Sequence, residues 1–415
     1  MSKEKVDVLV IGAGPSGVVS SAYLHNQGIK VKVVERQIFP RFVIGESLIP
    51  RCMDHFREVG LFDVLDQQGY QKKFGARFLK HGKVCEFDFS KKFTEGSSWT
   101  WQLPRAHMDN VLVEEIQRKG VDVSFETTVT NVEFNGTNSV TTVVDKEGNE
   151  SQIEAKFVID SSGYGRVLPR LLDLEQASDL DPRSSLFVHV EDINRPEGQE
   201  GWMITFDVLE QHVWFWVIPF SNGKTSLGFV ASPEYFEKGG TKEEIFDELL
   251  KNSPYFYDRF KDAPKEFDPV LINAFSVGIK QLWGEGYALT GNSTEFLDPV
   301  FSSGVTFATE SGLLAAKLAA RQIKGENVDW QTEYTDYIMQ GVETFKTYVK
   351  TWYTGELQDI FFVREENKEI KKQICSVLAG YVWDTNNQFV RNHKRAVSSL
   401  AKFIRSTYED SNTAV

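Results

Sequence analysis

The chain has 415 residues, more than one hydrophobic core usually contains, which indicates two or three structural units. Apolar residues make up 41% and charged residues 25%, a balance that excludes collagen-like and intrinsically disordered classes. The formal net charge of −13 disfavours general binding to nucleic acid or to anionic membranes.

The three cysteines, Cys52, Cys85 and Cys375, are too far apart for a CxxC metal site and cannot form a disulfide framework. We therefore expect a reducing, cytoplasmic location. The sequence shows no apolar stretch of the roughly 18–20 residues that a membrane helix needs, and its start does not resemble a signal peptide. No pair of histidines has the spacing of a helical metal site, so we expect no metal.

The first forty residues predict a strand, a helix and a second strand. Residues 6–11 are a near-continuous apolar run, as in a buried parallel strand, and residues 16–27 have the apolar spacing of a helix. Gly28 closes the predicted helix, and residues 30–34 form the next predicted strand. This order is typical of a βαβ dinucleotide-binding unit.

Gly12, Gly14 and Gly17 have GxGxxG spacing at the predicted strand-to-helix turn. The first glycine would allow the tight turn, the second the close approach of a pyrophosphate, and the third the close packing of helix on strand. The helix start adds free N–H donors for phosphates. Glu35, at the end of the second strand, can accept hydrogen bonds from ribose hydroxyls.

The following residues favour FAD over NAD, because no further βαβ unit follows. FPR at 39–41 and GESL at 45–48 resemble the stretch beside the cofactor in the glutathione-reductase-type FAD fold. The resemblance is to the group that holds aromatic hydroxylases, geranylgeranyl reductases and flavin-dependent halogenases. It implies that residues 50–65 form the next helix.

Three later motifs resemble the same group. LPR at 103–105 precedes a predicted helix over 109–119, and the family places this arginine, Arg105, near FAD. Residues 157–163 predict a strand that ends in a motif resembling the family's DG motif, with Asp160 and Gly163. Residues 128–130 resemble the strand that meets the adenine.

The last motif runs from residue 287 to 305 and leads into a helix over 306–320. The resemblance implies that the start of this helix faces the pyrimidine edge of the flavin. The family normally has Gly-Asp, with the aspartate bonding the ribityl chain, where this sequence has Gly291-Asn292. Asparagine can still hydrogen-bond a hydroxyl but adds no charge, so we expect FAD to bind less tightly than it would with an aspartate at this position.

Alternating apolar residues between 181 and 281 predict a substrate-side sheet. Within it, WFWVIP at 214–219 matches WxWxIP, a hallmark of flavin-dependent halogenases, and strand periodicity places Trp214 and Trp216 on one face. In that family the wall is thought to keep the organic substrate from the flavin. The structural alternative is that the two tryptophans are ordinary core residues.

A lysine is the second halogenase feature. KFGARF at 73–78 resembles the KxGxxF pattern of halogenases that act on phenols and pyrroles, which implies that Lys73 receives the hypohalous acid. The alternative is that Lys73 and its neighbour Lys72 are both solvated. The resemblance also implies a halide at Ser303-Gly304, and Phe301 replaces the acidic residue of tryptophan halogenases, which favours a phenol-like or carrier-bound substrate.

The predicted fold is α/β, α+β overall: a Rossmann-like FAD-binding domain, an inserted antiparallel substrate sheet and a C-terminal helical region. The FAD-binding domain is assigned residues 1–80, 103–180 and 275–325, the substrate domain 81–102 and 181–274, and the helical region 326–415. The catalytic candidates are Lys73, Trp214 and Trp216. The cofactor-binding candidates are Gly12, Ala13, Gly14, Pro15, Ser16, Gly17, Glu35, Arg36, Arg41, Glu46, Ser47, Arg105, Val129, Asp160, Ser161, Gly163, Gly291, Asn292, Asp298, Pro299, Ser303, Gly304 and Val305.

The resemblance implies an FAD-dependent oxidoreductase that uses reduced FAD, O2 and halide to halogenate an electron-rich aromatic compound. Two alternatives stay open: a reductase or hydroxylase acting on an apolar substrate, and a flavin-binding protein without turnover. The expected partners are a small aromatic or apolar substrate, with a separate flavin reductase and a carrier protein as further candidates. Neither nucleic acid nor a membrane segment is expected.

Overall fold

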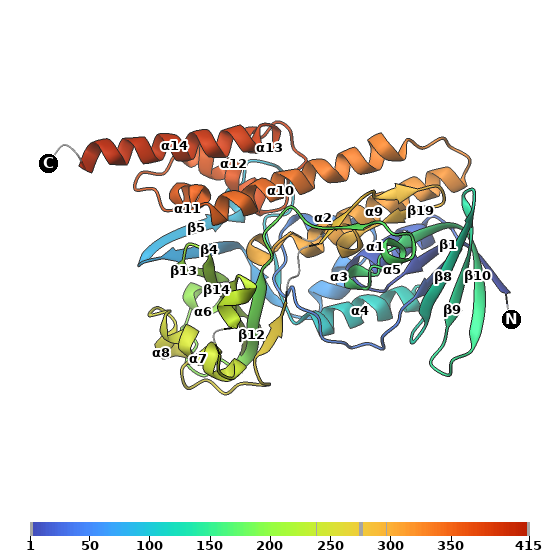
Figure 1. The fold of residues 1–415 in the computed structure, drawn as a ribbon, viewed down its shortest axis with the longest axis horizontal. Helices are drawn as coiled ribbons and strands as arrows, with labels where there is room; N and C mark the ends of the chain where they lie inside the picture. Colours follow the sequence, from blue (N-terminus) through green and yellow to red (C-terminus); the bar gives the residue numbers. More distant parts are fainter. Residues whose placement is uncertain (1–2, 238, 274–276, 296, 413–415) are drawn as a thin grey trace.

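The computed structural model describes residues 3–237, 239–273, 277–295 and 297–412, and Figure 1 shows three layers of structure. The first is an open sheet with strand order β18-β19-β10-β1-β2-β7, in which β19, β10, β1, β2 and β7 run parallel. Its strands are β1 (Lys3–Ile11), β2 (Val31–Val34), β7 (Asp122–Ser124), β10 (Glu150–Asp160), β18 (Trp283–Gly284) and β19 (Tyr287–Leu289). The hairpin β8 (Thr128–Asn135) and β9 (Asn138–Val144) joins the first half of β10.

Helices cover this sheet where the sequence predicts them. α1 (Pro15–Asn26) follows the glycine turn and packs on α9 (Gly304–Ile323) and α4 (Arg105–Arg118). The predicted helix over 50–65 is two helices, α2 (Arg51–Glu58) and α3 (Phe62–Asp66), because Gly60 between them has φ +71°, outside the helical range.

The second layer is a seven-stranded sheet with order β16-β12-β15-β14-β13-β4-β5, antiparallel except between β13 and β4. Its strands are β4 (Gly75–Lys80), β5 (Lys83–Asp88), β12 (Ser184–Glu191), β13 (Thr205–Glu210), β14 (Val213–Pro219), β15 (Lys224–Ala231) and β16 (Val270–Ile272). Phe215 belongs to the outer hydrophobic cluster, which also contains Phe246 of α7 (Lys242–Lys251), whereas Trp214 and Trp216 belong to the core shared with the first layer. β14 is therefore buried on both faces.

The third layer is helical and lies along the top of the molecule in Figure 1. It comprises α10 (Tyr337–Tyr353), α11 (Glu356–Phe361), α12 (Lys368–Leu378), α13 (Gln388–Arg391) and α14 (His393–Asn412). The smaller elements are β3 (Gln71–Lys73) paired with β6 (Thr100–Gln102), β11 (Glu175–Gln176) paired with β17 (Gly278–Ile279), α5 (Val167–Leu171), α6 (Gln199–Trp202) and α8 (Tyr257–Phe260).

The predicted fold class is confirmed: a parallel FAD-type sheet, a largely antiparallel second sheet and a helical C-terminal region. One predicted boundary differs. β4 pairs with β13 and β5, so the second sheet begins at residue 75, whereas the prediction placed residues up to 80 in the FAD-binding domain. The predicted boundary at 274/275 falls outside the described residues. No helix in the described part of the chain is long and apolar enough to cross a bilayer.

Candidate active site

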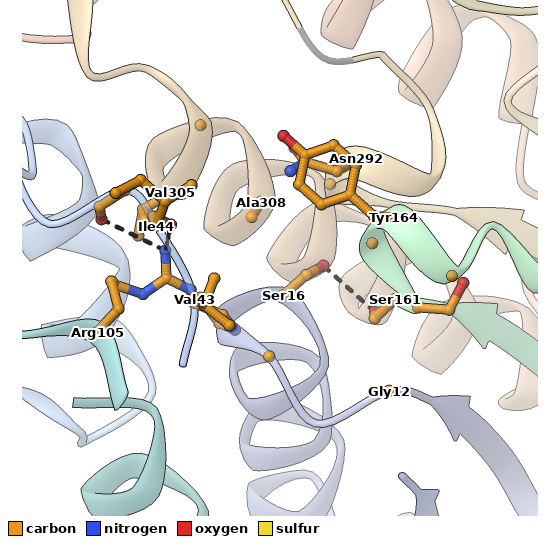
Figure 2. A pocket seen from close by; sticks show the side chains of 18 of the residues that line it. Gly12, Ser16, Val43, Ile44, Arg105, Ser161, Tyr164, Asn292, Val305 and Ala308 are labelled. Carbon is orange, nitrogen blue, oxygen red and sulfur yellow. Dashed lines mark hydrogen bonds between the residues drawn. The ribbon is translucent and has the colours of Figure 1, made fainter. Parts of the chain in front are cut away.

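A cavity of about 520 Å³ lies between the parallel sheet and the second sheet. Its size is in the range of cofactor and ligand sites. It is lined by the glycine turn, the end of β2, the loop over residues 41–47, the loop after β10, the start of α9 and one face of β13 and β14. Figure 2 shows the side chains that enter it.

Most of the predicted site residues line this cavity. They are Gly12, Gly14, Pro15, Ser16, Glu35, Arg36, Arg41, Glu46, Ser47, Arg105, Val129, Ser161, Gly163, Trp214, Trp216, Gly291, Asn292, Asp298, Pro299, Ser303, Gly304 and Val305. The other four, Ala13, Gly17, Lys73 and Asp160, lie behind its wall.

The glycine turn has the geometry that the spacing predicts. Gly12 has φ +98°, and a Cβ there would lie 2.5 Å from the Ser161 carbonyl oxygen. A Cβ on Gly17 would lie 2.0 Å from the Gly12 oxygen, so this glycine permits the close packing of α1, and it does not line the cavity. A Cβ on Gly14 would meet only the Arg41 guanidinium, at 3.7 Å, which leaves room for a phosphate to approach the backbone.

Glu35 holds the turn as well as facing the cavity. Its carboxylate accepts hydrogen bonds from the Ala13 N–H at 2.9 Å and the Gln37 N–H at 2.8 Å. Each carboxylate oxygen has a second lone pair, so Glu35 can also accept from a ribose hydroxyl. Ala13 thus positions the carboxylate and does not line the cavity.

Arg105 fixes the loop over residues 41–47. Its guanidinium donates to both carboxylate oxygens of Asp109, at 2.9 and 3.1 Å, and to the carbonyl oxygens of Ile44 and Gly45, at 3.3 and 3.4 Å. Figure 2 shows it beneath Ile44. The side chain lines the cavity as predicted, and its hydrogen bonds add a positioning role that the motif alone did not indicate.

Asp160 differs from the prediction. It is fully buried, and its carboxylate accepts hydrogen bonds from the Ser162 and Leu168 N–H groups, at 2.8 and 2.7 Å. Burial raises the pKa of Asp160, although these hydrogen bonds act to lower it. Its role is to hold the loop after β10, which places Ser161 and Gly163 in the wall.

The start of α9 faces the cavity with free backbone donors. Ser302 has φ +55° and turns the chain into α9, and Ser303 makes no side-chain cap. The first N–H groups of the helix are therefore available to an anion or to an electron-rich ring edge. Asn292 also faces the cavity, and its side chain makes no hydrogen bond within the described part of the chain.

Trp214 and Trp216 form an aromatic wall on the substrate side. Both are buried, and the Trp216 Nε1–H donates to Ser226 Oγ at 3.1 Å. The Trp214 Nε1–H donates to the Tyr353 hydroxyl at 3.0 Å, and that hydroxyl donates to Asp298 at 2.9 Å. Burial raises the pKa of Asp298 to about 6, although the hydrogen bonds from the Val300 N–H and from Tyr353 act to lower it.

Tyr353 is a further functional candidate, which the sequence marked only as one of several C-terminal aromatic residues expected mostly in the core, with the alternative that some of them close the substrate pocket. It comes from the end of α10, more than a hundred residues after Trp214, and no local pattern marks it. His189 is another candidate that lies outside the predicted set of site residues. It is buried, and its Nε2 lies 3.0 Å from Glu46, which lines the cavity. Burial would lower the pKa of His189, but the hydrogen bond and charge of Glu46 raise it overall.

Lys73 and Lys72 have opposite environments. Lys72 is exposed and lies over the Trp99 ring, whereas the Lys73 side chain is only 2% exposed. The Lys73 ammonium donates to Ser47 Oγ and to the Leu48 carbonyl oxygen, both at 2.8 Å. Burial lowers the pKa of Lys73 to about 7. Lys73 therefore lies directly behind Ser47, which is part of the cavity wall.

FAD fits this cavity, because the wall has an uncapped helix start, an open backbone at Gly14 and a strand-end carboxylate. The class that the fold and cavity define is that of FAD-dependent oxidoreductases. The profile of the family described as "FAD binding domain" matches residues 5–266, so the chain belongs to this family.

Similar proteins refine this assignment. The crystal structure of a flavoprotein/dehydrogenase from Cytophaga hutchinsonii is 49% identical, with a TM-score of 0.95 over 98% of this chain and 100% of the other. The 1H-pyrrole-2-carbonyl-[peptidyl-carrier protein] chlorinase of Pseudomonas fluorescens is 27% identical over 96% of this chain and 94% of its own. The tryptophan 2-halogenase of Chondromyces crocatus is 31% identical over 80% of this chain and 65% of its own. The chain thus resembles flavin-dependent halogenases.

Proposed function

We propose that this protein is a flavin-dependent halogenase that acts on an electron-rich aromatic compound of the phenol or pyrrole kind. The observation that carries the proposal is the environment of Lys73, a buried amine hydrogen-bonded to Ser47 at the wall of the flavin cavity. Among the residues that the structure describes, Lys73 has no carboxylate partner, and a buried lysine of this kind is costly to the fold. Such a cost is usually found at functional sites.

When bound, reduced FAD would give two electrons to O2 while a halide ion gives two more, so that the products are oxidised FAD, water and hypohalous acid. The first task of the protein's own residues is to bind the halide ion. The free N–H groups at Ser303 and Gly304, at the positive end of the α9 dipole, favour an anion at this end of the cavity. Trp214 and Trp216 close the substrate side, and in this role they keep the aromatic substrate away from the flavin ring.

Lys73 then holds the hypohalous acid for the aromatic substrate. With a pKa of about 7, the side chain populates both the ammonium and the amine at neutral pH. The ammonium can donate a hydrogen bond to the acid, and the amine can accept the halogen as a haloamine. In either case the net reaction is Ar–H + HOX → Ar–X + H2O, in which the ring loses a proton and the halogen is bound to carbon.

The substrate assignment rests on Phe301, which stands where the tryptophan halogenases that the sequence resembles have an acidic residue. Its ring packs in the core against Tyr348 and Trp352 of α10, at centroid distances of 6.2 and 5.9 Å. No carboxylate is therefore offered at this position, which favours a phenol-like or pyrrole-like substrate over an indole. We further propose that a carrier protein presents the substrate, as the name of the similar pyrrole-carrier chlorinase suggests, and that a separate reductase supplies reduced flavin, as in the halogenases that the sequence resembles.

The test is a reaction of the wild-type protein with reduced FAD, O2, bromide and phloroglucinol as the electron-rich probe. We expect a brominated product, identified by its isotope pattern, that is absent when bromide is omitted. Oxygenated or reduced products that form with NADPH regardless of halide would refute the proposal in favour of a hydroxylase or reductase. Rapid flavin reoxidation with no product from phenols, pyrroles or their carrier-bound forms would favour a protein without turnover.

A further inference from the structure

A line of ionisable side chains connects the surface of the molecule with the wall of the flavin cavity. Glu46 belongs to the cavity wall, and its Oε2 lies 3.0 Å from the Nε2 of His189. On the other side of the imidazole ring, Nδ1 lies 3.5 Å from Oε2 of Glu266. Glu266 in turn forms an ion pair with Lys224 of β15. Two carboxylates and an imidazole thus form a series of neighbouring proton-binding atoms.

The exposure of these side chains falls from the surface to the cavity wall. The side chain of Glu266 is 25% exposed, that of His189 10% and that of Glu46 only 1%. Among the described residues, His189 is the only side chain with which the Glu46 carboxylate forms a hydrogen bond or an ion pair. Glu266 therefore meets bulk water, whereas Glu46 has His189 on one side and the cavity on the other.

Aromatic rings enclose the imidazole of His189. Three phenylalanine rings lie at centroid distances of 6.0, 5.4 and 5.2 Å from it, namely Phe42, Phe220 and Phe267. The charged groups that face it are Glu46 from the loop over residues 41–47, Lys224 from β15 and Glu266 from the segment before β16. Burial acts to lower the pKa of His189, but the two carboxylates raise it overall, with Lys224 opposing them. The ring can therefore gain and lose a proton near neutral pH.

The proposed reaction takes up a proton at the flavin. Its balance is FADH2 + O2 + X⁻ + H⁺ → FAD + HOX + H2O, so every turnover consumes one proton. The later transfer of halogen, Ar–H + HOX → Ar–X + H2O, returns none. A proton must therefore reach the cavity once per turnover, although Trp214 and Trp216 close its substrate side.

We propose that Glu266, His189 and Glu46 carry protons from solvent to the flavin cavity, with Glu46 as the group that delivers them. This inference rests on the proposed halogenase function, which sets the demand for one proton per turnover. Glu46 faces the reacting groups, whereas His189 and Glu266 act only through Glu46.

Each transfer moves one proton between neighbouring atoms. Nε2 of the His189 imidazolium gives its proton to Glu46, which passes it to the cavity. The neutral ring then changes tautomer, so that its remaining proton lies on Nε2. Nδ1 takes a new proton from Glu266, which regains one from water. The 3.5 Å between Nδ1 and the Glu266 carboxylate is bridged by a small movement of this partly exposed side chain or by one water molecule.

A second buried histidine–glutamate pair provides the matched control. His55 Nε2 lies 2.7 Å from Glu310 Oε2, and His55 Nδ1 lies 2.7 Å from Thr309 Oγ1. Neither His55 nor Glu310 is among the described residues that line the cavity. Because this pair has the same chemistry without the contact to the cavity, His55→Gln should lower Tm and leave the pH dependence of the reaction unchanged.

The first test measures the coupling in the resting protein with oxidised FAD. The histidine Cε1–H NMR signals are followed from pH 5 to 9, and the His189 signal is identified by its loss in His189→Gln. We expect Glu46→Gln and Glu266→Gln each to lower the pKa of His189, because each removes a negative charge that faces the ring. His55→Gln should leave it unchanged. A pKa of His189 that is the same in wild type and in both glutamate variants would overturn the inference.

The second test follows product formation with reduced FAD, O2, bromide and phloroglucinol between pH 6 and 9. We expect His189→Gln and Glu266→Gln to form brominated product about tenfold or more slowly than wild type, since proton delivery contributes at least this much. The solvent deuterium isotope effect should rise in both variants because proton delivery becomes the slow step. Glu46→Asp, which keeps a carboxylate, should retain more activity than Glu46→Gln. Flavin absorbance checks that each variant still binds FAD.

The outcomes separate this inference from the halogenase function. If His189→Gln does not fold, Glu266→Gln decides, because Glu266 is partly exposed. Wild-type rates, pH profile and isotope effect in Glu266→Gln, with phloroglucinol brominated normally, would overturn the proton path and leave the halogenase function standing. A wild type that brominates nothing would overturn the halogenase function and, with it, the proton demand that this path meets.

Discussion

Replacing Lys73 by methionine should change how the stability of the protein depends on pH. Methionine has a similar length and no charge, so Lys73→Met removes a buried amine that the fold must desolvate. The pKa of this amine is lowered from 10.5 to about 7, and the difference corresponds to about 5 kcal/mol of destabilisation when the amine is charged in both states.

The sign follows from proton binding. Between pH 7 and 10.5 the unfolded chain keeps the Lys73 proton and the folded protein has lost it, so the free energy of unfolding rises with pH. Below pH 6 both states are protonated and the full cost applies. From pH 6 to 8.5 the wild type should gain about 2 kcal/mol relative to Lys73→Met.

The assay is urea unfolding of both proteins at pH 6.0, 7.0, 7.75 and 8.5, with the difference in unfolding free energy plotted against pH. Subtracting the two proteins cancels the other titrating groups. Lys72→Met is the matched control, because that side chain is exposed, and its difference should be flat. A difference for Lys73→Met that is independent of pH, or that moves in favour of the variant as pH rises, would refute the buried, uncharged state of this amine.

Four further variants test the cofactor site and the aromatic wall. Gly17→Ala should prevent folding or FAD binding, because its Cβ would lie 2.0 Å from a backbone oxygen. Gly14→Ala should fold but lose FAD affinity by about tenfold or more, as measured by flavin fluorescence titration. Equal FAD affinity in Gly14→Ala and wild type would contradict the predicted phosphate position. Tyr353→Phe removes the hydroxyl that accepts a hydrogen bond from Trp214, so Tm should fall by about 1–3 °C. More of the reduced flavin should then be oxidised with release of hydrogen peroxide in place of product. An unchanged yield of product per flavin oxidised would show that this hydroxyl does not position the wall. Asn292→Asp adds a charged acceptor beside the cavity and should tighten FAD binding by up to about tenfold, and weaker binding would contradict the predicted ribityl contact.

Local patterns predict the cofactor side of the site well. The strand, glycine turn, helix and terminal carboxylate lie within forty residues. Each glycine marks a position where the backbone, the packing or an approaching phosphate leaves no room for a side chain. The turn at Gly12 and the close packing at Gly17 therefore follow from spacing. The same reasoning failed for Asp160, because a carboxylate at a strand end can face either the ligand or the next turn, and in this protein both oxygens bind backbone N–H groups.

Contacts between distant segments could not be predicted in this way. Strand periodicity shows that Lys72 and Lys73 face opposite sides, but only the packing of β3 on β6 decides which side is buried. The hydroxyl of Tyr353 reaches Trp214 and Asp298 from a helix whose position depends on the whole C-terminal layer. The boundary placed at residue 80 divides β4 from β5 for the same reason, since the parallel pairing of β4 with β13 joins residues that are far apart in the sequence.

The most direct test of the proposed function separates flavin oxidation from halogen transfer. Reduced FAD is mixed with O2, bromide, phloroglucinol and either wild-type protein, Lys73→Met or Lys72→Met, and flavin reoxidation and brominated product are followed in the same reaction. We predict equal rates of flavin reoxidation in all three proteins, with product formed by the wild type and Lys72→Met and lost in Lys73→Met. Product formation by Lys73→Met at the wild-type ratio to flavin oxidised would contradict the role of Lys73 in halogen transfer and, with it, the proposed halogenase mechanism.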